Sequence, residues 1–231
     1  MGLFYGFDSY YLLLVMPTFI FALYAQFKVK STFNKYRKVT NMRGLTGADI
    51  ARTILDTNDL YDVEVQRIPG ELTDHYDPKS KVVRLSDAVY SSTSVAAIGV
   101  AAHETGHAIQ HKVRYAPLGL RSSLVPVANI GSSIGPYLAI FGLIFRWTEL
   151  IYAGIILFTA AVVFYLITLP VEFNASRRAV GILESTGMLN YNELAPVKKV
   201  LGAAAMTYVA SAAVAMANLL RLILLANNRR R

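Results

Sequence analysis

The sequence predicts a mainly α-helical integral membrane protein with about four transmembrane helices and a small α+β domain between the first two. Of its 231 residues, 54% are hydrophobic and only 16% are charged, a composition typical of membrane proteins. Four apolar stretches are each long enough to cross a hydrocarbon core of roughly 30 Å. The one long polar stretch, residues 28–123, contains both helix and strand patterns.

The four apolar stretches are residues 10–27, 124–145, 149–169 and 200–220. The first has no basic residue before it and no small-x-small cleavage site after it, so we expect a retained anchor. The fourth is rich in alanine and is bounded by Lys199 and Arg221. Its composition leaves open whether it crosses the membrane or lies at the interface.

Basic residues cluster directly after the first apolar stretch, between positions 28 and 43, whereas residues 1–9 contain none. The positive-inside rule therefore places the amino terminus outside and residues 28–123 in the cytoplasm. The expected location is the cell (inner) membrane, with several crossings. The three arginines at 229–231 conflict with this rule if the fourth stretch spans.

Charge and cysteine content exclude other classes of partner and site. The net charge is +8, but the basic residues lie at the ends of apolar stretches and not on a soluble face with interleaved aromatics. We therefore expect the lipid bilayer as a partner and no nucleic acid. The chain has no cysteine, so any metal site must use His and carboxylate ligands.

The polar stretch begins with a helix and two strands. Thr46 is a good N-cap residue for a helix ending near Thr57. Residues 63–68 and 81–85 alternate apolar and polar side chains, as half-buried strands do, and we expect a loop at 69–78 between them.

A longer helix follows, which the hydroxyl groups of residues 91–94 can cap and which continues to about Lys112. We expect Pro117 to end it before the second apolar stretch. That stretch contains Gly131 and Gly135, a small-xxx-small face that favours close packing within the chain over a dimer interface. Residues 146–149 are expected to form the turn between the second and third stretches.

The long helix contains the pentapeptide H-E-x-x-H from His103 to His107. On a helix these two histidines lie about 40° apart around the axis and one turn apart along it, so both reach one ion. Glu104 lies beside the open position of that ion, where it can take a proton from water. Residues 95–102 are apolar on all sides, so these ionisable groups lie on a buried helix and need a partner. The pattern predicts a hydrolase with one Zn²⁺.

Such a zinc ion needs a third protein ligand and one open position. His111 lies about 12 Å along the axis from His103, too far to share the ion. His75 comes from an upstream loop and is a weaker candidate. Glu172 is the first acidic residue after the third apolar stretch and lies on the predicted side of the zinc helix. Its position favours it, since the acidic residues downstream lie farther away.

The residues 103–110 (HETGHAIQ) and 170–179 (PVEFNASRRA) give the chain a family resemblance. It resembles the bacterial neutral zinc metallopeptidases of the membrane, the YugP-like group, over nearly its whole length. It is more distantly similar to the HtpX heat-shock peptidases and CAAX prenyl proteases, in which the Glu of an E-x-x-x-D helix is the third zinc ligand. The resemblance implies Glu172 as that ligand and a zincin-like fold for the soluble domain. Ser176 replaces the Asp and can still hydrogen-bond a ligand histidine.

The resemblance also implies how substrate is held. In such peptidases a strand beside the zinc helix pairs with the substrate backbone, and we expect residues 81–85 to be that edge. A donor for the oxyanion is also needed, and chemistry leaves four candidates open. These are Arg177, Arg178, Tyr191 and Tyr208.

The sequence thus predicts a membrane-embedded zinc endopeptidase with His103, His107 and Glu172 as metal ligands and Glu104 as general base. Its expected substrates are membrane or membrane-proximal polypeptides. The alternative is a non-catalytic or partner-activated adaptor that keeps a zinc site and binds a membrane protein or another copy. A transporter is disfavoured because the apolar stretches contain almost no ionisable residues. The expected parts are an anchor (1–27), a zinc region (28–123), a transmembrane hairpin (124–170), a third-ligand segment (171–199) and a C-terminal helix with a basic tail (200–231).

Overall fold

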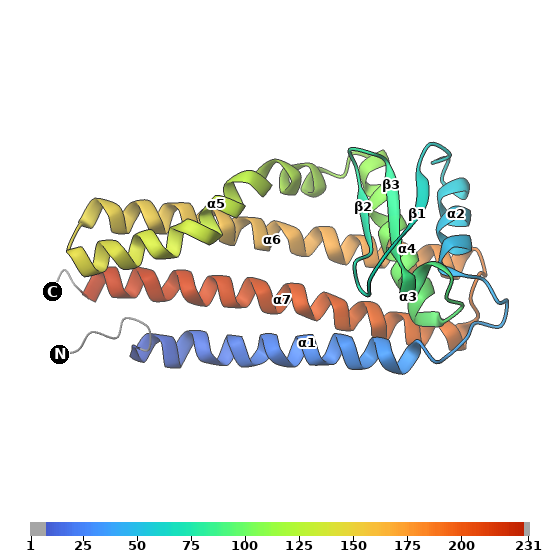
Figure 1. Cartoon of the computed structure of the whole chain (residues 1–231), viewed down its shortest axis with the longest axis horizontal. Helices are drawn as coiled ribbons and strands as arrows, with labels where there is room; N and C mark the ends of the chain where they lie inside the picture. The colour runs from blue at the N-terminus through green and yellow to red at the C-terminus, as the bar shows by residue number, and fades with distance from the viewer. Residues whose placement is uncertain (1–7, 229–231) are drawn as a thin grey trace. The chain divides into compact units, whose positions relative to one another are not determined.

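The computed structural model describes residues 8–228 (Figure 1). The elements in chain order are η1 (Tyr11–Val15), α1 (Met16–Tyr36), α2 (Gly47–Thr57), β1 (Glu64–Ile68), β2 (His75–Asp77), β3 (Val82–Ser86), α3 (Asp87–Tyr90), α4 (Val95–Lys112), α5 (Ala116–Phe145), α6 (Thr148–Ser185) and α7 (Tyr191–Asn228). They divide into two compact units. Unit 1 takes the described parts of Met1–Gln26, Leu120–Leu169 and Thr207–Arg231, and unit 2 takes Phe27–Gly119 and Pro170–Met206.

Among the described residues, four helices are long and apolar enough to cross a membrane. They are Tyr11–Tyr36, Ala116–Phe145, Thr148–Ser185 and Tyr191–Asn228. The expected number of candidate spans is confirmed by length and composition, and the fourth stretch is one of the four candidates. Each helix extends beyond the apolar stretch that it contains, and α5 begins eight residues before the second stretch.

Glycines let α5 and α6 approach closely within unit 1. A Cβ at Gly131 would lie 2.1 Å from the carbonyl oxygen of Leu157, and one at Gly135 would lie 3.0 Å from that of Gly154. Only a residue without a side chain fits such contacts. The expected packing of this small-residue face within the chain is confirmed.

A buried ion pair joins the two ends of unit 1. The Arg221 side chain on α7 is 7% exposed, and its Nε donates to Asp8 Oδ2 over 2.8 Å. Asp8 also accepts from the backbone N–H of Tyr11 at 2.9 Å, at the start of the first helix. The start of the first helical segment and the end of α7 are thus held side by side.

Unit 2 contains a three-stranded sheet in the order β1-β3-β2. β1 is parallel to β3 and β2 is antiparallel to it, so that Val83 is paired on both sides, with Val65 and with Tyr76. The expectation that residues 81–85 form an edge for substrate is therefore wrong. β2 lies in the segment that we expected to be a loop, and it covers that side of β3.

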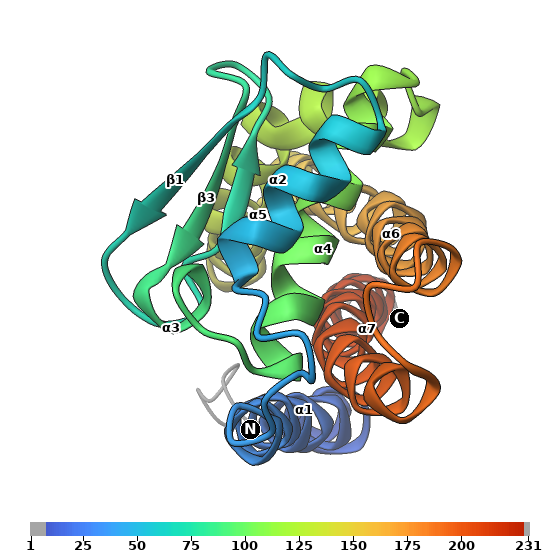
Figure 2. The same ribbon diagram turned by 90° about the vertical axis from the view of Figure 1, so that its right-hand side faces the viewer.

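The helices α2 and α4 cover one face of this sheet (Figure 2). The core between them contains Ile54 and Leu55 from α2, Ile98 from α4 and Leu85 from β3, all fully buried. A capping box begins α2, as expected: Thr46 Oγ1 accepts from the N3 backbone N–H, and the carboxylate of that residue accepts from the Thr46 N–H.

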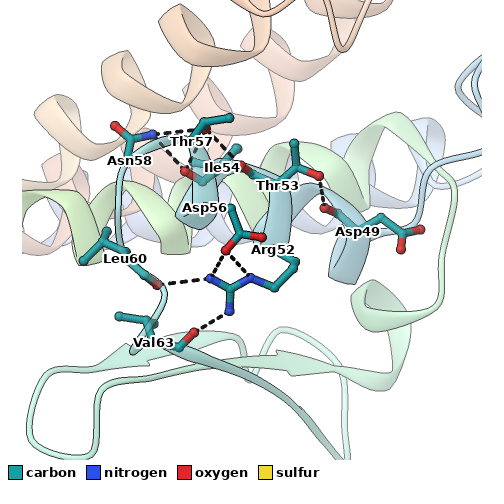
Figure 3. A network of polar contacts seen from close by, with 9 residues as sticks. All are labelled: Asp49, Arg52, Thr53, Ile54, Asp56, Thr57, Asn58, Leu60 and Val63. Atoms are coloured by element: carbon teal, nitrogen blue, oxygen red, sulfur yellow. Dashed lines mark hydrogen bonds and ion pairs between the residues drawn. The ribbon is translucent and has the colours of Figure 1, made fainter.

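Arg52 fixes the path of the chain from α2 to β1 (Figure 3). Its guanidinium group donates to Asp56 Oδ1 at 2.9 Å, to the carbonyl oxygen of Val63 at 2.7 Å and to that of Leu60 at 3.1 Å. A single side chain thus satisfies two loop carbonyl groups that the sheet leaves unpaired.

The helix α4 begins and ends where the sequence predicts. Ser94 caps it by accepting from Ala97 N at 3.2 Å, and it ends at Lys112. Pro117 does not end it, which corrects our expectation. The break comes earlier, at Arg114 with its positive φ of 52°, and Pro117 lies in the first turn of α5. There a helix needs no N–H donor, so proline is well tolerated.

Candidate metal centre

Three side chains from two helices of unit 2 converge on one point. His103 and His107 come from α4, Glu172 comes from α6, and their ligand atoms all lie within 4.8 Å of one another. Glu172 Oε2 is 3.2 Å from His103 Nε2 and 3.6 Å from His107 Nε2. The Glu172 side chain is only 3% exposed, so the group is shielded from solvent.

The distances from Glu172 to the two histidines fit a tetrahedral zinc site. Ligand atoms about 2.0–2.1 Å from an ion at tetrahedral angles lie roughly 3.3 Å from one another. The two distances from Glu172 lie on either side of that value. Two His and one Glu form a set that catalytic zinc sites use, with one position left for water.

Hydrogen bonds orient both imidazole rings. His103 Nδ1 lies 3.0 Å from Ser176 Oγ, and His107 Nδ1 lies 3.0 Å from Gln110 Oε1. In both rings Nε2 is therefore the nitrogen that faces Glu172. A hydrogen bond at the ring nitrogen that does not face the metal fixes the ring orientation and the tautomer of a metal-binding histidine. The Ser176 contact confirms that a hydroxyl group supports a candidate ligand here.

Gln110 determines the tautomer of His107. Its Nε2 donates to the carbonyl oxygen of Val171 at 2.8 Å and to Asn174 Oδ1 at 3.0 Å, so its Oε1 must face His107. His107 Nδ1 is then the donor, and in the neutral ring Nε2 carries a lone pair. That lone pair faces Glu172 Oε2 at 3.6 Å. Both atoms are acceptors, so a cation between them would be bound favourably.

The electrostatics of the site favour a cation. Burial disfavours the charged form of His107, yet the hydrogen bond that His107 donates to Glu172 and the charge of Glu104 outweigh it, so the pKa of His107 lies above its ordinary value. A divalent ion would compete with a proton for the same lone pair.

Glu104 is buried beside the ligands but is not engaged by them. It is 9% exposed, and within the described residues no hydrogen bond or ion pair engages its carboxylate. Burial raises the pKa of Asp74, and the nearby charge of Glu104 raises it further. Hydrogen bonds from Ser86 oppose these two effects without cancelling them.

Gly106 allows the two ligand-bearing helices to meet. A Cβ at this position would lie 2.8 Å from the carbonyl oxygen of Ala175, so the backbones of α4 and α6 are in contact there. Ala175 is itself fully buried. This close approach brings Glu172 and Ser176, one helical turn apart, to the same histidine.

Replacement of Gly106 tests this close approach. Gly106→Ala should separate the helices and lower the free energy of unfolding by about 1–3 kcal/mol, as overpacking does. The thermal midpoint and zinc content of the purified full chain in detergent would both fall. Gly181→Ala on α6 is the control, because a Cβ there meets no atom within 4 Å. Equal midpoints for the two variants would contradict the argument.

The two other histidines lie outside the group. Tyr76 Oη lies 2.9 Å from His111 Nδ1, and burial, with Asp62 and Asp77, raises the pKa of Tyr76 to about 12, which keeps the phenol protonated. His75 lies on β2 with Nδ1 2.8 Å from the Thr73 carbonyl oxygen. The geometric argument against His111 as a ligand is consistent with this placement.

The structure does not select an oxyanion donor among the four candidates. Arg178 Nε donates to Asn174 Oδ1 at 2.8 Å, so its guanidinium group is partly engaged. Arg177 and Tyr191 are exposed, and Tyr208 belongs to unit 1.

Sequence reasoning missed the roles of Gln110 and Asn174. Gln110 is fully buried on α4, three residues after His107. A long polar side chain on the buried face of a helix, next to a candidate ligand, is the signal that could have identified it. Asn174 gave no such signal, because its contact with Gln110 spans 64 residues.

Comparison with known proteins identifies the family of the chain. Residues 11–227 match the model of a family described as "Putative neutral zinc metallopeptidase". The chain is 54% identical over 209 residues to "Putative membrane protease YugP" of Bacillus subtilis (strain 168). The aligned region covers 90% of this chain and 93% of that protein. No solved structure matches the chain. With its His-His-Glu group and its four apolar helices, the chain belongs to the family described as "Putative neutral zinc metallopeptidase".

Proposed function

We propose that this protein is a membrane-embedded zinc-dependent endopeptidase of the gluzincin type, with its active site at the cytoplasmic surface of the inner membrane. The observation that carries the proposal is the convergence of His103, His107 and Glu172 on one buried point, with Glu104 next to it. Among the described residues the group has three members and no fourth protein ligand. This argues against a closed structural zinc site, which would need four.

The side chains have distinct roles in the proposed reaction. A zinc ion held by the three ligands would act as a Lewis acid and lower the pKa of a water molecule at its open position. Glu104 then takes the proton of the attacking water and later gives it to the leaving amine. Ser176 and Gln110 keep both histidine rings turned with Nε2 toward Glu172.

The expected substrates are membrane or membrane-proximal polypeptides. This follows from α6, which runs without interruption from the third apolar stretch through Pro170 to Glu172. With β3 in the middle of the sheet, a substrate backbone would pair with an edge strand. β2 is the favoured edge, because it is antiparallel to β3 and packs on α4, the helix with both histidines.

Metal removal tests the proposal directly. Dialysis of the full chain in detergent against a chelator should abolish cleavage of a labelled casein substrate, and about one equivalent of Zn²⁺ should restore it. A hydroxamate inhibitor should bind the zinc-loaded protein, because a catalytic site keeps an open position. Cleavage that continues after the zinc is gone would refute the proposal. Zinc without hydroxamate binding or cleavage would instead favour the adaptor.

Ser176 provides a finer test of the metal centre. Ser176→Ala removes the partner of His103 Nδ1 and should lower zinc affinity by about 10–100-fold, as loss of such partners does elsewhere. Competition with a fluorescent chelator measures this affinity. Ser185→Ala is the matched control, since its hydroxyl contacts only the Ile182 carbonyl oxygen near the end of the same helix. Unchanged affinity in Ser176→Ala would exclude the supporting role.

A further inference from the structure

A hollow of about 490 Å³ lies between α1 and α7 in unit 2. Figures 1 and 2 show the two helices side by side. Its walls include Lys28, Lys35 and Tyr36 from α1, and Lys199, Gly202 and Met206 from α7. Its size is within the range of about 300–1,000 Å³ that is usual for small-ligand sites. The metal centre uses none of these residues.

The hollow is long and open along its middle. On each helix its lining covers eight residues, Lys28 to Lys35 and Lys199 to Met206, or about two turns. A Cβ at Gly202 would meet no atom within 4 Å. The glycine therefore leaves the middle of the hollow free for a chain-like ligand.

Three lysines give the hollow a positive charge. No ion pair among the described residues involves Lys28, Lys35 or Lys199. The Lys35 ammonium group lies 5.4 Å from the centre of the Tyr36 ring. An anion is therefore the complementary ligand, and the protein supplies no internal one.

The hollow lies at the end of the first apolar stretch and at the beginning of the fourth. Lys28 directly follows the first stretch, and Lys199 directly precedes the fourth. Gly202 and Met206 lie inside the fourth stretch, so the hollow has an apolar part as well as a charged one. Lysines at the cytoplasmic end of a span face the acidic headgroups of the bilayer.

We propose that this hollow is a binding site for one acidic phospholipid. Its phosphate group pairs with the lysine ammonium groups, and part of an acyl chain lies against Gly202 and Met206. An acidic peptide would match the charge but not the apolar part at membrane depth. The proposal goes beyond peptidase activity and does not depend on it.

Lipid binding to the purified full chain tests this site. Native mass spectrometry from detergent micelles would be run with short-chain phosphatidylglycerol, with phosphatidylcholine and with inorganic phosphate. We expect one phosphatidylglycerol to be retained and neither of the others. Lys28→Gln with Lys199→Gln should weaken its binding about thirtyfold, at roughly fivefold for each charge. Gly202→Leu should block it by filling the hollow.

The matched control is Lys30→Gln with Lys198→Gln, which removes the same charge from the same helices outside the hollow. It should retain the lipid. Equal weakening in both double variants would show diffuse surface attraction and overturn the site. Phosphate binding as tight as that of the lipid, or displacement of the lipid by polyglutamate at lower concentration, would overturn the lipid assignment. If Gly202→Leu fails to fold, as zinc content would show, the two double variants decide.

Discussion

Glu104→Gln should keep its zinc and lose its peptidase activity. We expect kcat to fall by about 10²–10⁴-fold, the range for loss of a general acid–base group. The amide has the shape of the carboxylate but cannot take a proton from water. Glu104 is 9% exposed and no described hydrogen bond engages it, so the replacement breaks no hydrogen bond of the described residues.

Three measurements on the purified full chain check this result. They are zinc content, thermal midpoint and the rate of casein cleavage. Glu184→Gln is the matched control, because this exposed carboxylate lies on the helix that carries Glu172 but outside the site. Full cleavage by Glu104→Gln would sink the mechanism. Loss of zinc would instead give Glu104 a role in metal binding.

Glu172→Ala should release the metal. The remaining ligands are two neutral imidazoles, and loss of the only charged ligand should weaken zinc binding by more than about 100-fold, the upper range for a supporting residue. Activity at micromolar zinc would fall with it. The expected loss is large because Glu172 lies 3.2 Å and 3.6 Å from the two Nε2 atoms.

Glu172→His distinguishes ligation from folding. Three histidines also form a zinc site with an open position, so this variant should recover part of the metal that Glu172→Ala loses. Zinc content and thermal midpoint would be measured for both variants. If Glu172→Ala keeps stoichiometric zinc with unchanged affinity, another residue is the third ligand and the proposed site is incorrect.

Much of this architecture is predictable because its signals are local. The spans follow from runs of apolar residues, and α2 and α4 from capping residues such as Thr46 and Ser94. The two histidines are four residues apart, so helix geometry alone brings them together. Glu172 required a further step, its position after the third apolar stretch, and the structure places it beside both histidines.

The features that could not be predicted from the sequence depend on contacts between residues that are far apart in the chain. β2 has only three residues, and its partner strand β3 becomes central only once both neighbours are in place. The short segment shows no clear alternation, so its register was not readable. Gln110 and Asn174 likewise meet across two helices. Pro117 misled because proline is favoured in the first turn of a helix as well as after the end of one.

The ion pair between Asp8 and Arg221 has a consequence for biosynthesis. Its partners are 213 residues apart in the sequence, so it cannot form until the segment that contains Arg221 has left the ribosome. Asp8, at the start of the first helix, therefore has no arginine partner while the helices before Arg221 are synthesised. Closure of unit 1 around this pair is then one of the last steps of assembly, and a chain truncated before Arg221 would leave Asp8 without its counter-charge.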